Sequence, residues 1–307
     1  MIYKRDRLAF LGPLALACAL LGVTFVSPSR TASAAMTPVV SVGPQYDSTH
    51  VYVSPADIDR FTASFVATFG GKVSKKITLT VTPTASSTLW RFITSPVGTL
   101  SVFGFTTPIP YPFGSERTGY LVADMDKAIR AAIADGADLI VDPFDDPVGR
   151  DAVLEWPGGV RMQLYWHTVA PHYPSLATVP ENRVYVSSGR AGAFARAFIA
   201  FSHGTIESDA PRASGVEIGR ADQSYRRIRI RSPFGKMTVL GSDGHLPYPY
   251  GRELMGYEVP NLEATLVKAR ASGAIVLVRP YVSDGRRAAL VRFPGGYVAE
   301  IHAAVSR

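Results

Sequence analysis

Glu300 and His302 have types and spacing that could support acid–base chemistry. They lie two positions apart in a segment predicted to be a strand, so both side chains should point to the same face of a sheet. A carboxylate and an imidazole on one face could move a proton or bind a cation, which makes Glu300 a candidate catalytic residue. A solvated strand face, or a salt bridge to a neighbouring arginine, accounts for the pattern equally well.

A second candidate is a segment that occurs twice, Pro-Tyr-Pro-aromatic-Gly-x-Glu-x-x-Gly-Tyr at 110–120 and 247–257. Its tyrosines and glutamate could give a small-molecule site aromatic walls and a carboxylate for proton transfer. Alternatively, its prolines and glycines shape a crossover and its glutamates satisfy backbone donors. The candidate catalytic residues here are Glu116 and Tyr120, and the candidate ligand-binding residues are Tyr111, Tyr120, Glu253 and Tyr257.

Two arginines stand where the first half of the chain has aromatic residues. Arg227 and Arg229 share one face of a predicted strand and align with Trp90 and Phe92. If that face lines a binding site, its ligand is anionic, and both arginines are candidate ligand-binding residues. A solvated strand face is the alternative interpretation.

The N-terminus has the pattern of an export signal. Basic residues at 4–7 precede an apolar run at 8–26 and the small-residue motif 32–34, which predicts a signal peptide over 1–34 and a periplasmic or extracellular protein. An uncleaved anchor, or a lipid on Cys18, remains an alternative. Cys18 is the only cysteine, so the mature protein would have no disulfide and no thiolate chemistry.

The charge of the chain gives little support to a nucleic-acid partner. The formal net charge is +7, but part of it belongs to the predicted leader. Apart from the arginines at 226, 227, 229 and 231, the remaining basic residues are scattered, without a stacking motif of interleaved aromatics. We therefore expect a small-molecule ligand, no nucleic acid and no stable membrane association after cleavage. A homodimer and a monomer are both compatible with the sequence.

An internal repeat organises the chain into two halves. The segment that begins at Ser95 recurs from Ser232, and the match extends to the Trp-Pro-Gly-Gly and Phe-Pro-Gly-Gly turns near the ends of the halves. A proline-bearing stretch at 168–180 reads as a linker. We therefore predict one domain at 46–167 and a second at 181–305.

Each half is predicted to contain two units of the order strand, helix, three strands. In the later unit of the first half, Asp124 is a good N-cap and Gly136 a good stop for a helix with one apolar face. The Pro-Gly-Gly turn at 157–159 then precedes a final alternating strand. The earlier unit repeats this order, with a helix from about Pro55 to Phe69.

This doubled βαβββ pattern resembles the vicinal-oxygen-chelate superfamily, which includes glyoxalase I, extradiol dioxygenases, methylmalonyl epimerases and bleomycin-resistance proteins. The resemblance implies an α+β fold of two open, cup-shaped domains. It also implies that up to four side chains on the first and last strands of the units bind one divalent metal. Such a metal would act as a Lewis acid beside a proton-transferring carboxylate.

The positions implied by the resemblance are only partly filled by ordinary metal ligands. In the first half they are His50, Ser101, Tyr120 and Gln163. In the second half they are Arg183, Thr238, Tyr257 and Glu300. His50 and Gln163 are therefore the candidate metal ligands, with a structural role as the alternative for His50, and the site is expected to be incomplete.

Three functions follow from these observations. The first is a binder of a small organic molecule without a complete metal site. The second is a lyase, isomerase or dioxygenase of the glyoxalase type that uses one divalent metal in the first domain; export argues against a glutathione-dependent reaction. The third is a structural or partner-binding module, because fold does not fix function.

Overall fold

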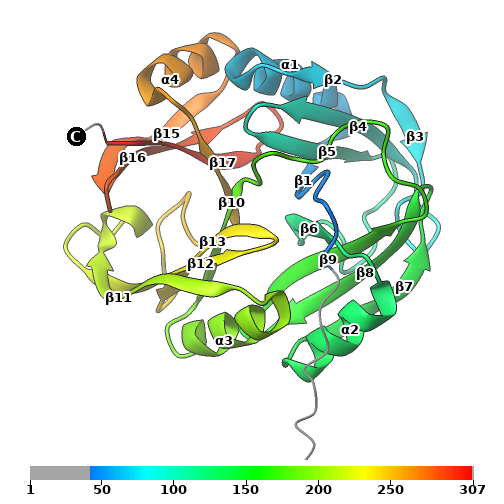
Figure 1. Ribbon diagram of the computed structural model, residues 1–307. Helices are drawn as coiled ribbons and strands as arrows, with labels where there is room; N and C mark the ends of the chain where they lie inside the picture. The colour runs from blue at the N-terminus through cyan, green and yellow to red at the C-terminus, as the bar shows by residue number, and fades with distance from the viewer. Residues whose placement is uncertain (1–41, 306–307) are drawn as a thin grey trace, which may run out of the picture. The chain divides into compact units, whose positions relative to one another are not determined.

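Two curled β-sheets, one from each half of the sequence, organise the part of the chain that the structure describes, residues 42–305 (Figure 1). The structure is a computed structural model. The described residues all belong to one compact unit. The expected signal peptide and Cys18 lie outside the described residues. Among the described residues, no helix has the length and apolar character needed to cross a membrane.

The first sheet has the strand order β2-β4-β5-β1-β6-β9-β8-β7, with β3 also paired to β4. Its strands are β1 (Thr49–Tyr52), β2 (Lys72–Val73), β3 (Ile77–Leu79), β4 (Thr88–Ser95), β5 (Gly98–Phe105), β6 (Thr118–Leu121), β7 (Asp138–Asp145), β8 (Gly149–Trp156) and β9 (Val160–His167). The opening strands of the two units, β1 and β6, lie antiparallel at the centre, and each pairs in parallel with the last strand of its own unit.

The second sheet repeats this topology in the order β11-β12-β13-β10-β14-β17-β16-β15. Its strands are β10 (Glu181–Ser187), β11 (Thr205–Ser214), β12 (Ser224–Ser232), β13 (Gly235–Ser242), β14 (Leu254–Glu258), β15 (Ile275–Ser283), β16 (Arg286–Arg292) and β17 (Val298–Ala304). Here β10 and β14 are the central antiparallel pair, and they pair in parallel with β13 and β17.

Four helices pack in pairs between units of different halves (Figure 1). They are α1 (Ile58–Phe69), α2 (Met125–Ala134), α3 (Ala191–Ser202) and α4 (Leu262–Ala271), with 3-10 turns at Pro55–Asp57 and Gly215–Ile218. One apolar core joins α1 to α4 and the other joins α2 to α3. Each core buries large aromatics, such as Phe65 beside Phe293 and Trp156 beside Phe198, which stabilise the pairing by removing apolar area from water.

The expected βαβββ repeat is confirmed, and local sequence explains its details. The Asp124 carboxylate accepts a hydrogen bond of 2.9 Å from the Lys127 amide and caps α2, and Gly136 follows that helix with φ of +94°. In β1, Val51 enters the helix-side core while His50 and Tyr52 line a cavity on the opposite face. Strand alternation therefore separates a packing face from a face available to a ligand.

Candidate functional site

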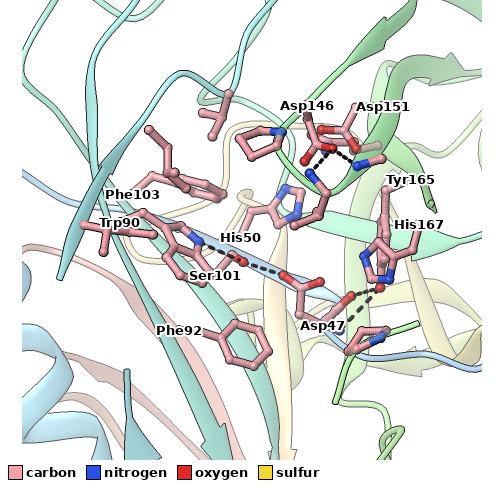
Figure 2. Close-up of a pocket in the computed structure, with 18 of the residues that line it drawn as sticks. Asp47, His50, Trp90, Phe92, Ser101, Phe103, Asp146, Asp151, Tyr165 and His167 are labelled. Atoms are coloured by element: carbon pink, nitrogen blue, oxygen red, sulfur yellow. Dashed lines mark hydrogen bonds between the residues drawn. The ribbon is translucent and has the colours of Figure 1, made fainter. Parts of the chain in front are cut away.

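The cup of the first sheet encloses a cavity of about 760 Å³ (Figure 2). We call this face the first-half cup, and the corresponding face of the second sheet the second-half cup. One wall is aromatic and includes Trp90, Phe92 and Phe103 from β4 and β5. Figure 2 shows Asp146, Asp151 and His167 on the opposite wall, with His50 between the two walls. The cavity is therefore apolar on one side and polar on the other.

His50 lies at the centre of the first-half cup. It is 4% exposed, its ring meets Phe103 edge to face, and its Nδ1 atom has no hydrogen-bond partner. Burial, together with the positive charge of Arg117, lowers the pKa of His50 to about 4. The imidazole is therefore neutral at neutral pH and could donate or accept one hydrogen bond.

Gln163, the second metal-ligand candidate, lines the same cavity on β9. Its side chain hydrogen-bonds Asp151, which is 5% exposed and comes from β8. Burial, and the nearby charge of Asp146, raise the pKa of Asp151 well above its usual range. The structure thus brings His50 and Gln163 to one cavity and adds a carboxyl group that the sequence analysis missed.

Asp47 is the other polar group that the sequence analysis missed. It precedes β1, and its Oδ2 atom accepts a hydrogen bond of 2.5 Å from the Ser101 hydroxyl, which in turn accepts one from Trp90 Nε1 at 3.3 Å. Tyr165 donates its hydroxyl hydrogen to the Asp47 carbonyl. Burial raises the pKa of Asp47 to about 6. Ser101, expected as a ligand position, thus holds this carboxyl group at the cavity surface.

Glu116 and Tyr111 do not line this cavity directly. Glu116 is fully buried and accepts a hydrogen bond from Tyr52, whose ring lines the cavity. Burial raises the pKa of Glu116 to about 7. Tyr111 is 80% exposed, and its hydroxyl accepts a hydrogen bond of 2.8 Å from Arg161. Of these two candidates, only Glu116 is connected to the cavity, through Tyr52.

The structure places Tyr120 and Tyr257 on the helix side of their strands, away from both cups. Tyr120 belongs to the α2–α3 core and Tyr257 to the α1–α4 core. The preceding residues, Gly119 and Gly256, face the cups instead: a Cβ at Gly119 would lie 2.9 Å from His50 Nε2, and one at Gly256 would lie 3.3 Å from Arg183 Cδ. The positions that match metal ligands of the family are therefore Gly119 and Gly256, one residue before each tyrosine, and a glycine has no side chain to bind a metal.

Glu253 lies where the two halves meet. Its Oε1 atom accepts a hydrogen bond of 3.1 Å from Thr118 on β6, and the Asn182 amide of β10 donates to the same Thr118 hydroxyl at 3.1 Å. Burial raises the pKa of Glu253 to about 7. Glu253 thus accepts from a side-chain hydroxyl, whereas the structural interpretation of the repeated segment expected its glutamates to satisfy backbone donors.

The second-half cup has a buried arginine at the position of His50. Arg183 is 1% exposed and forms ion pairs with Glu181 at 2.8 Å, Glu217 at 2.8 Å and Glu300 at 3.1 Å. The pKa of Glu217 falls to about 2: burial opposes the shift, and the charges of Arg183 and Arg227 more than offset it. Glu300 also lies 3.1 Å from His302 Nδ1, so it contacts its predicted partner His302 and also forms the ion pair with an arginine that the alternative interpretation expected.

Arg227 and Arg229 also point into the second-half cup, as expected if their strand face lines it. Arg227 pairs with Glu217 at 2.8 Å and with Asp284 at 2.9 Å, and Arg229 pairs with Asp284 at 3.0 Å. Carboxylates of the chain therefore already occupy the positions that an anionic ligand would take.

The donor set does not fit the divalent metal that the fold implies. The aligned first-half positions supply one imidazole, one amide and one hydroxyl, with Gly119 in the remaining place. In the second half, the Arg183 guanidinium would repel a cation. Within residues 42–305, no group of three or more His, Cys, Asp or Glu side chains could hold a metal ion.

Comparison with known proteins supports the fold. No family model and no curated protein matches the chain. Among solved structures, a mutant of 4-hydroxymandelate synthase from Streptomyces coelicolor aligns at 12% identity and a TM-score of 0.56, over 85% of this chain and 93% of the other. The Mn(II)-bound glyoxalase from Novosphingobium aromaticivorans aligns at 11% and 0.55, over 87% and 84%.

A third similar structure is a xylose isomerase-like TIM barrel/4-hydroxyphenylpyruvate dioxygenase fusion protein. It aligns at 11% identity and a TM-score of 0.53, over 88% of this chain and 50% of the fusion. Identities this low support the architecture rather than a shared activity. The chain therefore has the vicinal-oxygen-chelate fold, built as two glyoxalase-like domains in tandem.

Proposed function

We propose that this protein binds a small organic molecule in its first-half cup without the help of a metal ion. The observation that carries the proposal is the cavity of about 760 Å³, which has an aromatic wall facing a few polar groups. Ligand sites are commonly concave, of about 300–1,000 Å³, and mostly apolar with a small number of orienting polar groups. The second-half cup, whose inward charges pair with one another, is not part of the proposed site.

A thermal-shift screen with aromatic compounds tests this binding. A ligand at about 100 times its dissociation constant adds about 2.7 kcal/mol of stability. For a protein of this size the midpoint should rise by about 5 °C or more. Trp90→Ala should reduce the rise because Trp90 lines the cavity. Trp166→Phe is the matched control, since Trp166 packs against the helix-side core. A rise that is unaffected by Trp90→Ala would place binding elsewhere.

The metal-dependent alternative is separated from this proposal by elemental analysis. The protein would be purified without chelator and reloaded with Mn, Fe, Co, Ni or Zn, alongside His50→Ala. We expect no stoichiometric metal in either protein, because the donor set is incomplete. One metal per chain that disappears with His50 would instead favour a lyase, isomerase or dioxygenase of the glyoxalase type.

Export is a separate part of the proposal and is supported by the sequence of residues 1–34 alone. The protein would act in the periplasm or outside the cell, after cleavage following Ala34. Mass spectrometry of the protein recovered from those fractions tests this. An intact Met1 terminus in the cytoplasm would contradict it, and a lipid on Cys18 would favour the anchored alternative.

A further inference from the structure

The walls of the first-half cup differ in charge as well as polarity. The lining residues include three aspartates, Asp47, Asp146 and Asp151, and no lysine or arginine. Arg117 is near but outside the lining: its guanidinium lies over the Tyr52 ring, 5.4 Å from the centroid. Of the lining histidines, His50 is neutral and burial lowers the pKa of His167. Among residues 42–305, the cavity lining thus gathers acidic groups and includes no arginine or lysine.

The three aspartates differ in the hydrogen bonds that their carboxylates already accept from the protein. Asp146 accepts hydrogen bonds from the amides of Val148 and Gly149 and thereby shapes its own loop. The side-chain partners of the other two carboxyl groups among the described residues are neutral: Ser101 and Tyr165 for Asp47, and Gln163 for Asp151. Asp151 is buried and Asp47 is half-buried, and carboxylates in such places without a positive partner are costly to ionise, so a cation between them would lower that cost.

An independent observation also points to a ligand. The Nδ1 atom of His50 is buried and has no hydrogen-bond partner in the described part of the chain, although the large majority of buried side-chain polar atoms in folded proteins have one. The Nε2 side of the ring faces Gly119. A ligand with a hydrogen-bonding group near the carboxylates could form the hydrogen bond that the His50 Nδ1 atom lacks.

The aromatic wall suits the rest of such a ligand. Trp90 and Phe92 are stacked with their ring centroids 5.8 Å apart, and both are half-buried, so they offer an apolar surface that is open to the cavity. Aromatic faces carry a negative quadrupole that attracts cations and prefer flat apolar partners. The two walls together therefore favour a flat body that carries a positive charge.

We propose that the first-half cup takes an organic cation, a protonated amine carried on an aromatic body, with its ammonium between Asp47 and Asp151. The body packs on Trp90 and Phe92, and the ammonium forms charge-assisted hydrogen bonds with the carboxylates. This inference rests on the proposed function, because it requires the first-half cup to be the binding site.

Calorimetric titration of the purified chain with three probes of similar shape tests the inference. The probes are 2-naphthylmethylamine, which is cationic, 2-naphthylmethanol, which is neutral, and 2-naphthoate, which is anionic. We expect the amine to bind at least tenfold more tightly than the alcohol, and the naphthoate to bind most weakly. If the alcohol or the naphthoate binds as tightly as the amine, the charge inference fails and the proposed function stands. If no probe binds at millimolar concentration, both fail.

Variants locate the charge preference. Asp47→Asn and Asp151→Asn keep the shape of the side chain and should each weaken amine binding about fivefold or more while leaving the alcohol unchanged. Asp145→Asn is the matched control, since Asp145 is 91% exposed, lies beside Asp146 and does not line the cavity. Its amine affinity should stay within about twofold of the parent. An amine preference that survives the Asp47→Asn/Asp151→Asn double variant would overturn the inference.

Discussion

The first-half cup presents Trp90 and Phe92 to an open cavity, whereas the second-half cup has Arg227 and Arg229 at the matching positions. At the centre of each cup, His50 is neutral and has an unpartnered nitrogen, while Arg183 is held by three glutamates. The same fold thus contains one cup whose acidic groups have no arginine or lysine among the described lining residues, and one cup whose glutamates pair with a buried arginine. The first-half cup therefore has an open cavity with acidic groups in its lining, whereas the inward charges of the second-half cup pair with one another.

The largest effect should come from breaking the second-half network. Arg183→Ala leaves Glu181, Glu217 and Glu300 without their shared counter-charge, and removing one partner of a buried ion pair typically costs about 3–5 kcal/mol. We expect a loss of this size in urea denaturation at pH 7. His50→Ala, at the matching position, should cost less than half as much. Equal losses would contradict the contrast between the cups.

A smaller effect should follow from giving the first-half cup a residue of the second. Phe92→Arg removes part of the aromatic wall and places a positive charge opposite Asp47. We expect the affinity for 2-naphthylmethylamine to fall about 30-fold, or about 2 kcal/mol. Phe92→Leu keeps an apolar surface and should lose less. Calorimetry measures both, and unchanged binding in Phe92→Arg would show that this wall does not hold the probe.

The two cups should also respond differently to pH. Asp47, whose pKa is about 6, faces the hydroxyls of Ser101 and Tyr165 and the carboxylate of Asp146. As the pH falls from 7.5 to 5, Asp47 takes up a proton while an alkylammonium stays charged, so amine affinity should fall about tenfold. Calorimetry across this range measures the change. In Asp47→Asn the profile should flatten, and a steep profile there would assign the effect to another group.

In the second-half cup the pKa of Glu217 is lowered to about 2, a shift in the opposite direction to that of Asp47. Its contribution to stability is complete above the unfolded-state pKa near 4.5 and is lost as the pH falls through about 2. The slope of the unfolding free energy against pH, measured between pH 7 and pH 5, should therefore be the same in Glu217→Gln as in the parent protein. A pH slope in this range that disappears with Glu217→Gln would contradict the assignment.

The smallest effect should come from a tyrosine of the helix-side core. The Tyr257 hydroxyl lies 2.8 Å from that of Tyr297, and a hydrogen bond of this kind contributes about 1 kcal/mol. Tyr257→Phe should reduce the free energy of unfolding by about that amount and leave amine binding unchanged. A change in probe affinity would show that Tyr257 communicates with the cup.

Much of the fold could be predicted from the sequence because the repeat is local and periodic. Strand alternation, the Asp124 cap and the Gly136 stop are short-range signals, and the doubled Pro-Gly-Gly turns align the two halves. The positions implied by the family resemblance include His50 and Gln163, which the structure brings to one cavity.

The remaining features depend on long-range contacts or on which face of a short strand is buried. Tyr120 and Gly119 differ by one position, and only the close approach of His50 shows that the glycine faces the cup. Arg183 meets Glu217 and Glu300 across long stretches of sequence, and no local pattern predicts these pairs. Asp47 precedes its strand, so strand alternation does not reveal that it reaches the cavity.

A crystal structure of the protein with bound 2-naphthylmethylamine tests the central contrast most directly. The account predicts one probe molecule in the first-half cup, with its rings on Trp90 and Phe92 and its ammonium within hydrogen-bonding distance of Asp47 or Asp151. A probe bound among Arg183, Arg227 and Arg229, or an empty first-half cup at a saturating concentration, would contradict it.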